Sequence, residues 1–184
     1  MTQTQPKPTN HRAADPSFPQ RTRTYTWQDP LIGAGAAPGL SGMQYLRGMA
    51  RGDFPPPPIG QTLGFTIGRE EDVEEGRVTF RMRPEEFHYN PIGSVHGGVY
   101  ATLLDSALGC AIHTMLPAGV GYTSIELKVS YLRAVSAASG TLTAHGRVTK
   151  PGRRVAFAEG EVRTAAGAVV ATASSSCLII GPAS

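Results

Sequence analysis

Cysteines, long apolar runs and a signal segment are scarce or missing in this sequence of 184 residues. It has two cysteines, Cys110 and Cys177, and no C-x-x-C motif. This argues against a disulfide framework and predicts two buried, reduced thiols. No stretch approaches the roughly 18 apolar residues of a membrane helix, and residues 1–20 contain no apolar signal segment. We therefore expect a cytoplasmic protein without a membrane span.

Strong charge of one sign is also missing. The net charge is +3, the isoelectric point is near 9.1, and no long basic run occurs. A nucleic-acid partner is therefore not expected. A hydrophobic content of 40% is compatible with one packed core, and the length favours one main domain.

The first 59 residues differ from the rest in composition. We expect residues 1–59 to form an N-terminal arm and residues 60–184 to form the domain. Residues 1–24 are rich in proline, threonine and glutamine, which predicts disorder because few apolar side chains are present to be buried.

The arm nevertheless contains one candidate helix. Ser41 is a good N-cap for a helix over residues 42–51, and residues 55–58 form a polyproline spacer. One interpretation is that this helix and Trp27 pack back onto the domain. The other is a loosely attached arm.

A helical pattern begins at Gly97. From Val99 to Ile112, apolar residues recur every three or four positions, and Pro117 closes the segment. The spacing predicts a helix over residues 97–113, which would be about 25 Å long.

Asp105 is the only charged residue between Glu86 and Glu126. It lies in the middle of the predicted helix, where aspartate has a poor helix propensity. The residues on the same strip are mostly small, namely Ala101, Thr102, Ser106 and Gly109. Because small residues allow another backbone to approach, we expect this strip to face something other than water. A solvated helix face is the alternative, although such a face normally carries several charges.

The start of this helix is a second candidate for chemistry. Its first N–H groups have no partner within the helix and carry the positive end of the helix dipole. With Gly97 and Gly98 at this position, an oxygen of a ligand can approach the backbone closely. This arrangement predicts an oxyanion hole, while a simple tight turn is the alternative.

Strand patterns surround the helix on both sides. Alternating apolar residues predict strands over residues 61–67, 78–82, 123–132, 140–149, 154–164 and 168–180. Their short connections favour antiparallel pairing. One long helix against one antiparallel sheet is an α+β arrangement.

The strand directly after the helix alternates most clearly. Its expected buried face carries Ile125, Leu127, Val129 and Tyr131. Its expected opposite face carries Ser124, Glu126, Lys128 and Ser130. This pattern is typical of a strand that is buried on one face.

A family resemblance rests on residues 90–98, which read N-P-x-G-x-x-H-G-G and are followed by the apolar helix with Asp105. The stretch resembles the hotdog-fold acyl-CoA thioesterases of the phenylacetate-degradation type, over about residues 60–180. The resemblance implies a hotdog fold, in which an antiparallel sheet wraps around one long central helix. It also implies hydrolysis of an acyl-CoA thioester to the free acid and CoA. CoA is then part of the substrate, and no cofactor is expected.

The resemblance assigns roles within the site. Asn90 and the backbone N–H of Gly97 would hold the thioester oxygen, and Asp105 would act as general base or nucleophile. Ser124 would position the water or Asp105. His96 matches the histidine of the family motif and either contacts substrate or is structural. We expect no metal there, because no second ligand keeps a metal-binding spacing.

Contacts with coenzyme A are implied at two places. Basic residues around a Pro-Gly turn lie, in this family, near the nucleotide end of CoA, where cations can meet its phosphates. In this chain the turn contains Lys150, Gly152, Arg153 and Arg154. A solvated turn is the alternative. His88 and Tyr89, just before the motif, could line the pantetheine entrance, and Gly98 within the motif is expected to bind substrate or CoA.

Gly97 and Asp105 are separated by about 12 Å along the helix axis. One chain therefore cannot bring both to the same carbonyl carbon. Two antiparallel helices in a two-fold dimer can do so and create two identical sites. We expect an inactive monomer and an active homodimer, and the resemblance implies that dimers pair into a homotetramer.

Other functions remain possible on such a fold, because fold alone does not decide function. A non-catalytic acyl-CoA sensor would more often have lost the carboxylate. A dehydratase would need a differently placed histidine. The acyl group cannot be read from the sequence, so aryl, medium-chain and long-chain groups all remain open.

Overall fold

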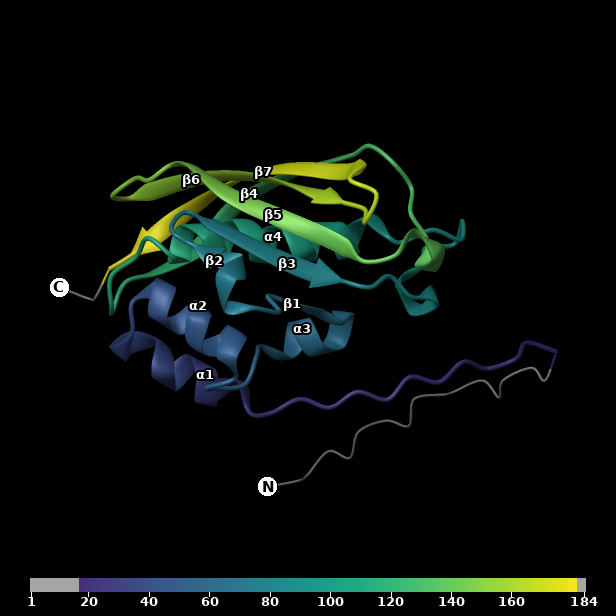
Figure 1. The fold of residues 1–184 in the computed structure, drawn as a ribbon, viewed down its shortest axis with the longest axis horizontal. Coiled ribbons are helices and arrows are strands. Elements are labelled where there is room, and N and C mark those ends of the chain that lie inside the picture. Colours follow the sequence, from purple (N-terminus) through teal and green to yellow (C-terminus); the bar gives the residue numbers. More distant parts are fainter. Residues whose placement is uncertain (1–16, 182–184) are drawn as a thin grey trace, which may run out of the picture.

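The structure is a computed structural model that describes residues 17–181. A curled antiparallel sheet covers one long helix, α4 (Gly97–His113), and three short helices lie on the other side of that helix (Figure 1). The hotdog fold expected from the resemblance is confirmed. No helix within residues 17–181 is long and apolar enough to cross a membrane.

The sheet has seven strands, all paired antiparallel. Their order is β1-β3-β5-β6-β7-β4, and β2 pairs with β3. The strands are β1 (Phe65–Thr66), β2 (Val73–Glu74), β3 (Arg77–Met82), β4 (Gly121–Tyr131), β5 (Leu142–Lys150), β6 (Val155–Arg163) and β7 (Val169–Ile180). Short 3-10 helices cover Ala37–Gly39, Glu70–Asp72, Glu86–His88 and Ala137–Ser139.

Helix α4 has the predicted bounds, and its apolar face fills the curl of the sheet. Leu103, Leu104 and Leu108 are fully buried there. Gly146 on β5 allows the helix to lie close, because a Cβ atom at this position would come within 2.3 Å of the Ala107 carbonyl oxygen. Burial of these side chains, worth about 1.5–3 kcal/mol each, therefore fixes the helix on the sheet.

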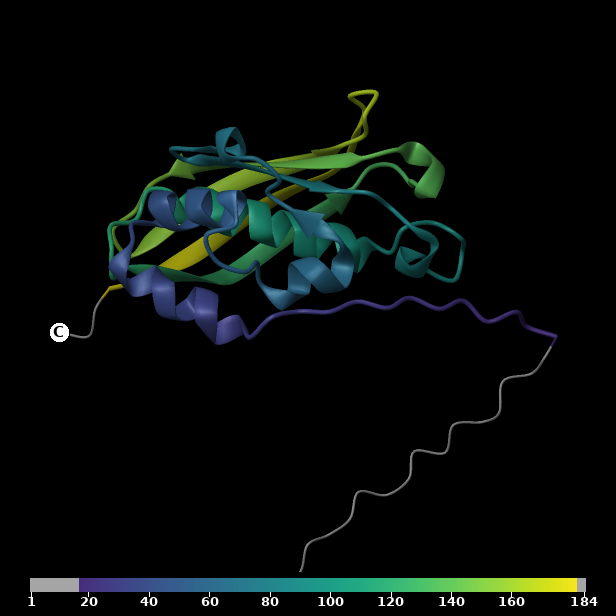
Figure 2. The same ribbon diagram turned by 60° about the horizontal axis from the view of Figure 1, so that its bottom comes forward.

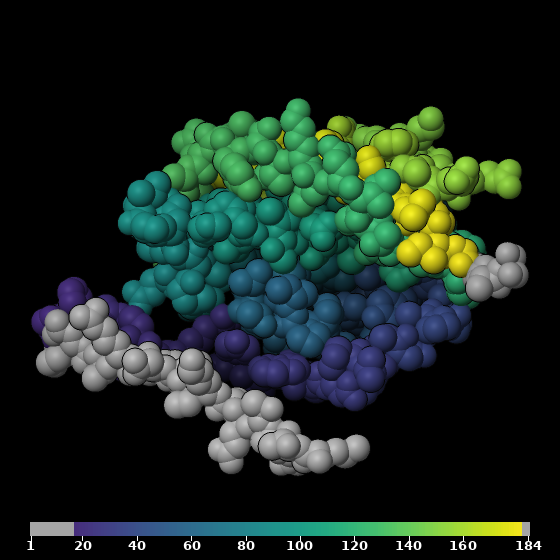
Figure 3. Space-filling view, turned by 180° about the vertical axis from the view of Figure 1, so that it is seen from behind, coloured from purple at the N-terminus to yellow at the C-terminus, as the bar shows by residue number. Residues whose placement is uncertain are grey.

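The N-terminal helices form a separate layer against α4, seen in purple and blue in Figures 2 and 3. They are α1 (Pro30–Ala36), α2 (Gly42–Arg51) and α3 (Pro58–Leu63). The predicted Ser41 cap of α2 is confirmed, since its side chain accepts from the Gln44 N–H in a capping box. Helix α2 packs on α4 through buried Leu46.

Two predictions for the N-terminal part are wrong, and one is only partly tested. Trp27 does not pack onto the domain; it is 58% exposed and touches Tyr25 instead. Residues 61–63 belong to α3 rather than to a strand, because Pro58 starts a helical turn and Gly64 ends it in the left-handed conformation. Of the expected disordered residues, 1–16 lie outside the described residues, while residues 17–24 are exposed and form no helix or strand.

The predicted alternation in β4 is wrong up to a bulge and right beyond it, where Leu127 and Val129 pack against the core as expected. A β-bulge at Ile125 adds one residue between Ser124 and Glu126, opposite Cys177 and Ser176 of β7. A bulge shifts the side-chain alternation by one position. Ser124 therefore faces α4 on the same side as Leu127, whereas Ile125 is 56% exposed.

Candidate active site

Asp105 lies half-buried on α4, within reach of β4. The hydroxyl of Ser124 donates a 2.7 Å hydrogen bond to Asp105 Oδ1. The same hydroxyl lies 3.8 Å from the sulfur of buried Cys177. Within residues 17–181, no cation forms an ion pair with Asp105 and no other group hydrogen-bonds to its second oxygen. One carboxylate oxygen is thus held, and the other is available.

The start of α4 presents one free backbone donor. His96 is the N-cap residue, and its Nδ1 accepts a 2.9 Å hydrogen bond from the Gly98 N–H. The Gly97 N–H finds no acceptor within residues 17–181. The ring of Tyr131 lies beside Gly97, where a Cβ atom would come within 2.9 Å of it. His96 therefore caps the helix, while Gly97 keeps an N–H at the positive end of the dipole.

Asn90 shapes the loop before α4. Its Oδ1 accepts from the N–H groups of Ile92 and Ser94 at 3.1 and 3.2 Å, and its Nδ2 donates to Ser94 Oγ at 3.1 Å. Both polar atoms of the amide thus have partners within the loop. The Asn90 side chain stabilises the turn that leads into Gly97.

His88 and Tyr89 are tied to their own chain. His88 is buried; its Nδ1 accepts from the Glu85 N–H, and its Nε2 donates to the Leu63 carbonyl, each at 2.9 Å. Burial lowers the pKa of His88, which keeps the ring neutral. The Tyr89 hydroxyl accepts from the Ala137 N–H at 2.7 Å. These contacts favour structural roles for both residues over the predicted contact with pantetheine.

The basic turn between β5 and β6 is open to solvent. Lys150, Arg153 and Arg154 are exposed, and none of them forms an ion pair within residues 17–181. Gly152 is required for the tight turn, since a Cβ atom would come within 1.8 Å of the Val155 carbonyl oxygen. The three cations are therefore free to meet anionic groups.

A further group of residues, along α4 from Asp105, was not predicted from the sequence. Tyr122 packs over Gly109, where a Cβ atom would lie 2.6 Å from the ring. Cys110 lines the same region as Tyr122, and burial raises the pKa of the Cys110 thiol to about 12. His113 lies next to Tyr122, with ring centroids 5.4 Å apart. The spacing of Asp105, Gly109 and His113 by four residues was the signal that could have found this extension of the strip.

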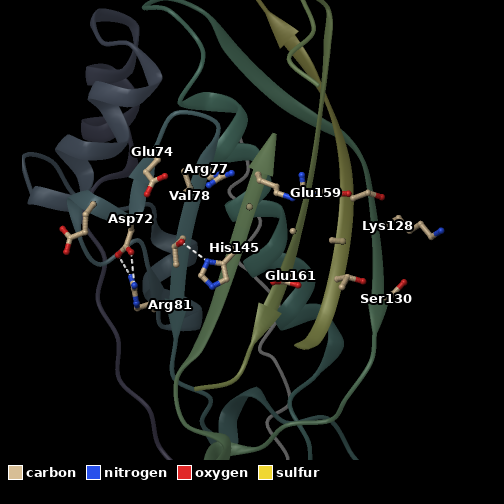
Figure 4. Close-up of a pocket in the computed structure, with 18 residues that line it drawn as sticks. Asp72, Glu74, Arg77, Val78, Arg81, Lys128, Ser130, His145, Glu159 and Glu161 are labelled. Carbon is tan, nitrogen blue, oxygen red and sulfur yellow. Dashed lines mark hydrogen bonds and ion pairs between the residues drawn. The ribbon is translucent and has the colours of Figure 1, made fainter. Parts of the chain in front are cut away.

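A concave region lies on the sheet face opposite α4 (Figure 4). It is a cavity of about 850 Å³ crossed by paired polar groups. Arg81 forms an ion pair with Asp72, Arg147 pairs with Glu159, and Thr79 lies 3.0 Å from His145. Several of the charges here are paired, and Asp105 lies on the other face of the sheet. In the described part of the chain, no three histidine, cysteine or acidic side chains gather as a metal site requires.

Strand β4 is an edge of the sheet, because within residues 17–181 it pairs with β7 alone. Its exposed side chains include Ile125 and Tyr131, each 56% exposed, and Leu132 follows at 60%. The outer backbone of β4 therefore has no strand partner within residues 17–181.

These features define a hotdog-fold protein with an unneutralised carboxylate on its central helix. Residues 92–171 match the family described as the thioesterase superfamily. The chain is 40% identical over 109 residues to an esterase-like protein of Halobacterium salinarum, a match that covers 56% of this chain and 68% of that one. It is 34% identical over 83 residues to acyl-coenzyme A thioesterase 13 of Homo sapiens, covering 45% of this chain and 57% of that protein.

A solved structure agrees with these matches. The phenylacetic acid degradation-related protein of Ralstonia eutropha JMP134 superposes with a TM-score of 0.65 at 32% identity, covering 73% of this chain and 98% of that chain. The chain therefore belongs to the thioesterase superfamily and is a thioester hydrolase by class. The resemblance to the phenylacetate-degradation type is confirmed.

Proposed function

We propose that this protein hydrolyses acyl-CoA thioesters at sites shared by two copies of the chain. The Asp105 carboxylate, held by Ser124 with one oxygen free, is the observation that carries the proposal. The name of the human relative, an acyl-coenzyme A thioesterase, supports CoA as the thiol part of the substrate.

In this mechanism the Gly97 N–H donates to the thioester oxygen and stabilises the negative charge that develops there. Asp105 either removes a proton from water or attacks the carbonyl carbon itself. Ser124 is a positioning residue, because its hydroxyl fixes the orientation of the carboxylate. The C–S bond breaks, and water supplies the hydroxyl of the acid and the proton of the thiol.

The shared site follows from distance. Gly97 and Asp105 are eight residues apart on α4, or about 12 Å along its axis. An antiparallel partner helix would place its own Gly97 opposite Asp105. The open β4 edge and the small residues beside Asp105 favour this approach. We propose a homodimer as the smallest active unit, with pairing of dimers into a homotetramer.

The contacts with CoA are proposed on the same basis. Arg153, Arg154 and Lys150 would meet the phosphates of CoA from the β5–β6 turn, since they have no partner of their own within residues 17–181. Arginine suits this role because its planar fork matches phosphate oxygens.

Asp105→Asn tests the function directly. The change preserves shape and removes the charge, so kcat for acyl-CoA hydrolysis should fall by about a hundredfold or more. Free CoA released from a panel of acyl-CoA thioesters is the measurement. Glu161→Gln makes the same chemical change on the outer sheet face and should leave kcat unchanged.

Two outcomes would contradict the proposal. If Asp105→Asn turns over normally, the carboxylate is not the reacting group. If the unaltered chain binds acyl-CoA but hydrolyses none of the panel, the non-catalytic sensor is the better account.

A further inference from the structure

A cavity of about 480 Å³ lies between the N-terminal helices and the C-terminal end of α4. It is lined on one side by α2 and the segment before it, and on the other by α4 and the start of β4. Most of its lining side chains are apolar or aromatic, including Tyr45, Leu46, Met49, Cys110, Val120 and Tyr122. No aspartate, glutamate, lysine or arginine is among them. The cavity therefore suits an uncharged, apolar ligand group.

Aromatic rings run along this cavity in a row. Phe54 stacks on Tyr45 with centroids 4.9 Å apart, Tyr45 lies 5.6 Å from His113, and His113 lies 5.4 Å from Tyr122. Rings at these distances present flat, low-entropy surfaces for an aliphatic or aryl group. Burial lowers the pKa of His113, so this ring is also neutral near pH 7.

The cavity lies farther along the side of α4 that carries Asp105, although neither Asp105 nor Ser124 lines it. On α4, Asp105, Gly109 and His113 follow one another at four-residue spacing, so they lie along one side of the helix. On β4, Ser124 touches Asp105, and Tyr122, two residues before it, touches Gly109. The cavity and Asp105 therefore lie along the same side of α4, with the Tyr122 ring over Gly109 between them. His113 lies about 12 Å beyond Asp105 along the axis.

The wall formed by α2 is fixed in place. The Gly42 N–H donates to the Leu116 carbonyl at 3.0 Å. A Cβ atom at Gly42 would come within 1.8 Å of the His113 carbonyl oxygen, so the helix start touches the end of α4 directly. The capping box at Ser41 secures the same end. This wall is preformed, and it lies outside residues 92–171, where the family match falls.

We infer that this cavity receives the acyl group of the substrate, and that α2, through Tyr45 and Met49, limits the length of the acyl group. The inference rests on the proposed function, since it places the thioester carbonyl at Asp105. The substrate class that fits is a CoA thioester of a medium-length or aryl-terminated apolar acid. The N-terminal helices then act as a specificity wall added to the thioesterase domain.

The test changes the wall at Met49. Met49→Ala should shift the preferred straight-chain acyl group toward longer chains, and Met49→Trp toward shorter ones. Each buried methylene gained or lost should change kcat/KM by about fourfold, from about 0.8 kcal/mol per CH₂. Met43→Ala is the matched control. It is the same residue type on the same helix, is also partly buried, and does not line the cavity. Its profile should match that of the unaltered chain.

A binding measurement separates this inference from the proposed function. Non-hydrolysable acyl-CoA thioethers of increasing chain length are titrated into the full chain, and CoA without an acyl group serves as reference. If Met49→Ala and Met49→Trp shift the length dependence of Kd in opposite directions, the cavity holds the acyl group, whatever the role of Asp105. If neither variant alters the length dependence of Kd or of kcat/KM while Asp105→Asn abolishes turnover, the acyl group lies elsewhere and only this inference is overturned.

Discussion

The two faces of the sheet carry charge in opposite ways. On the outer face, several acidic and basic side chains pair with one another, as Arg81 does with Asp72 and Arg147 with Glu159. On the face toward α4, Asp105 is the single charged residue of its helix, and within residues 17–181 its hydrogen-bond partner is the neutral Ser124.

This difference shows which charges are chemically available. Exposed ion pairs contribute only about 0.2–1 kcal/mol each and chiefly keep a surface solvated. A half-buried carboxylate without a cation is not neutralised, so its free oxygen can interact with water or substrate. The size of a concave region is therefore a poor guide to function here. The larger cavity lies on the sheet face away from Asp105, while the smaller one lies along the same side of α4 as Asp105.

The cations of the β5–β6 turn have no ion-pair partner within residues 17–181, in contrast to the paired arginines of the outer face. The double change Arg153→Ala with Arg154→Ala should raise KM for acyl-CoA by about three- to thirtyfold, at about 0.2–1 kcal/mol per contact. Because such contacts act equally on ground state and transition state, kcat should stay nearly constant. Initial rates over a range of substrate concentrations give both constants.

The paired arginine on the outer face is the control. Arg147→Ala removes a cation of the same type, which already has a partner, and should leave KM unchanged. The rise in KM caused by the Arg153→Ala and Arg154→Ala double change should be smaller at high salt. It should be absent for a short thioester that lacks the nucleotide. An equal rise in KM for that short thioester would mean that the two arginines support the fold instead.

The smallest expected effect concerns His113 and the pH dependence of the free energy of unfolding. Burial lowers the pKa of His113 below its usual value of about 6.5. The folded state then binds fewer protons than the unfolded state, so the stability that His113 supplies is full above about pH 6.5 and is lost as the pH falls below it. His113→Phe keeps an aromatic ring at this position but removes the titrating group. The free energy of unfolding should therefore decrease less steeply as the pH falls.

Urea unfolding at a series of pH values between 7 and 5 measures this effect. The unaltered chain, measured under the same conditions, is the reference. A pH dependence that is the same in His113→Phe and the unaltered chain would show that His113 does not contribute.

Local signals in the sequence were enough for much of the fold. The bounds of α4 follow from the glycines before it, the spacing of its leucines and Pro117 after it. The cap at Ser41 is likewise a property of a few neighbouring residues. Asp105 was predicted to be a candidate because it is isolated in charge, and the structure shows that it remains so within residues 17–181.

Features that depend on partners far away in the sequence were not predictable in this way. The bulge at Ile125 is hidden because an apolar residue continues the expected alternation, and only pairing with β7 reveals the extra residue. The cavity beside α4 is formed by α2, α4 and β4, which are distant in the chain. Trp27 is 58% exposed and contacts Tyr25, and a large apolar side chain does not by itself reveal which surface it will pack against.

The central claim is that each active site takes Gly97 from one chain and Asp105 from the other. Chains carrying Asp105→Asn are co-expressed with chains carrying Gly97→Pro under two different tags, and the heterodimer is purified by both tags. Proline removes the backbone N–H and is tolerated at the first position of a helix. Each homodimer should lose about a hundredfold or more of its kcat. The heterodimer has one site with both residues intact, so it should recover about half of the unaltered activity. A heterodimer that forms but stays as inactive as the two homodimers would show that each site is built within a single chain.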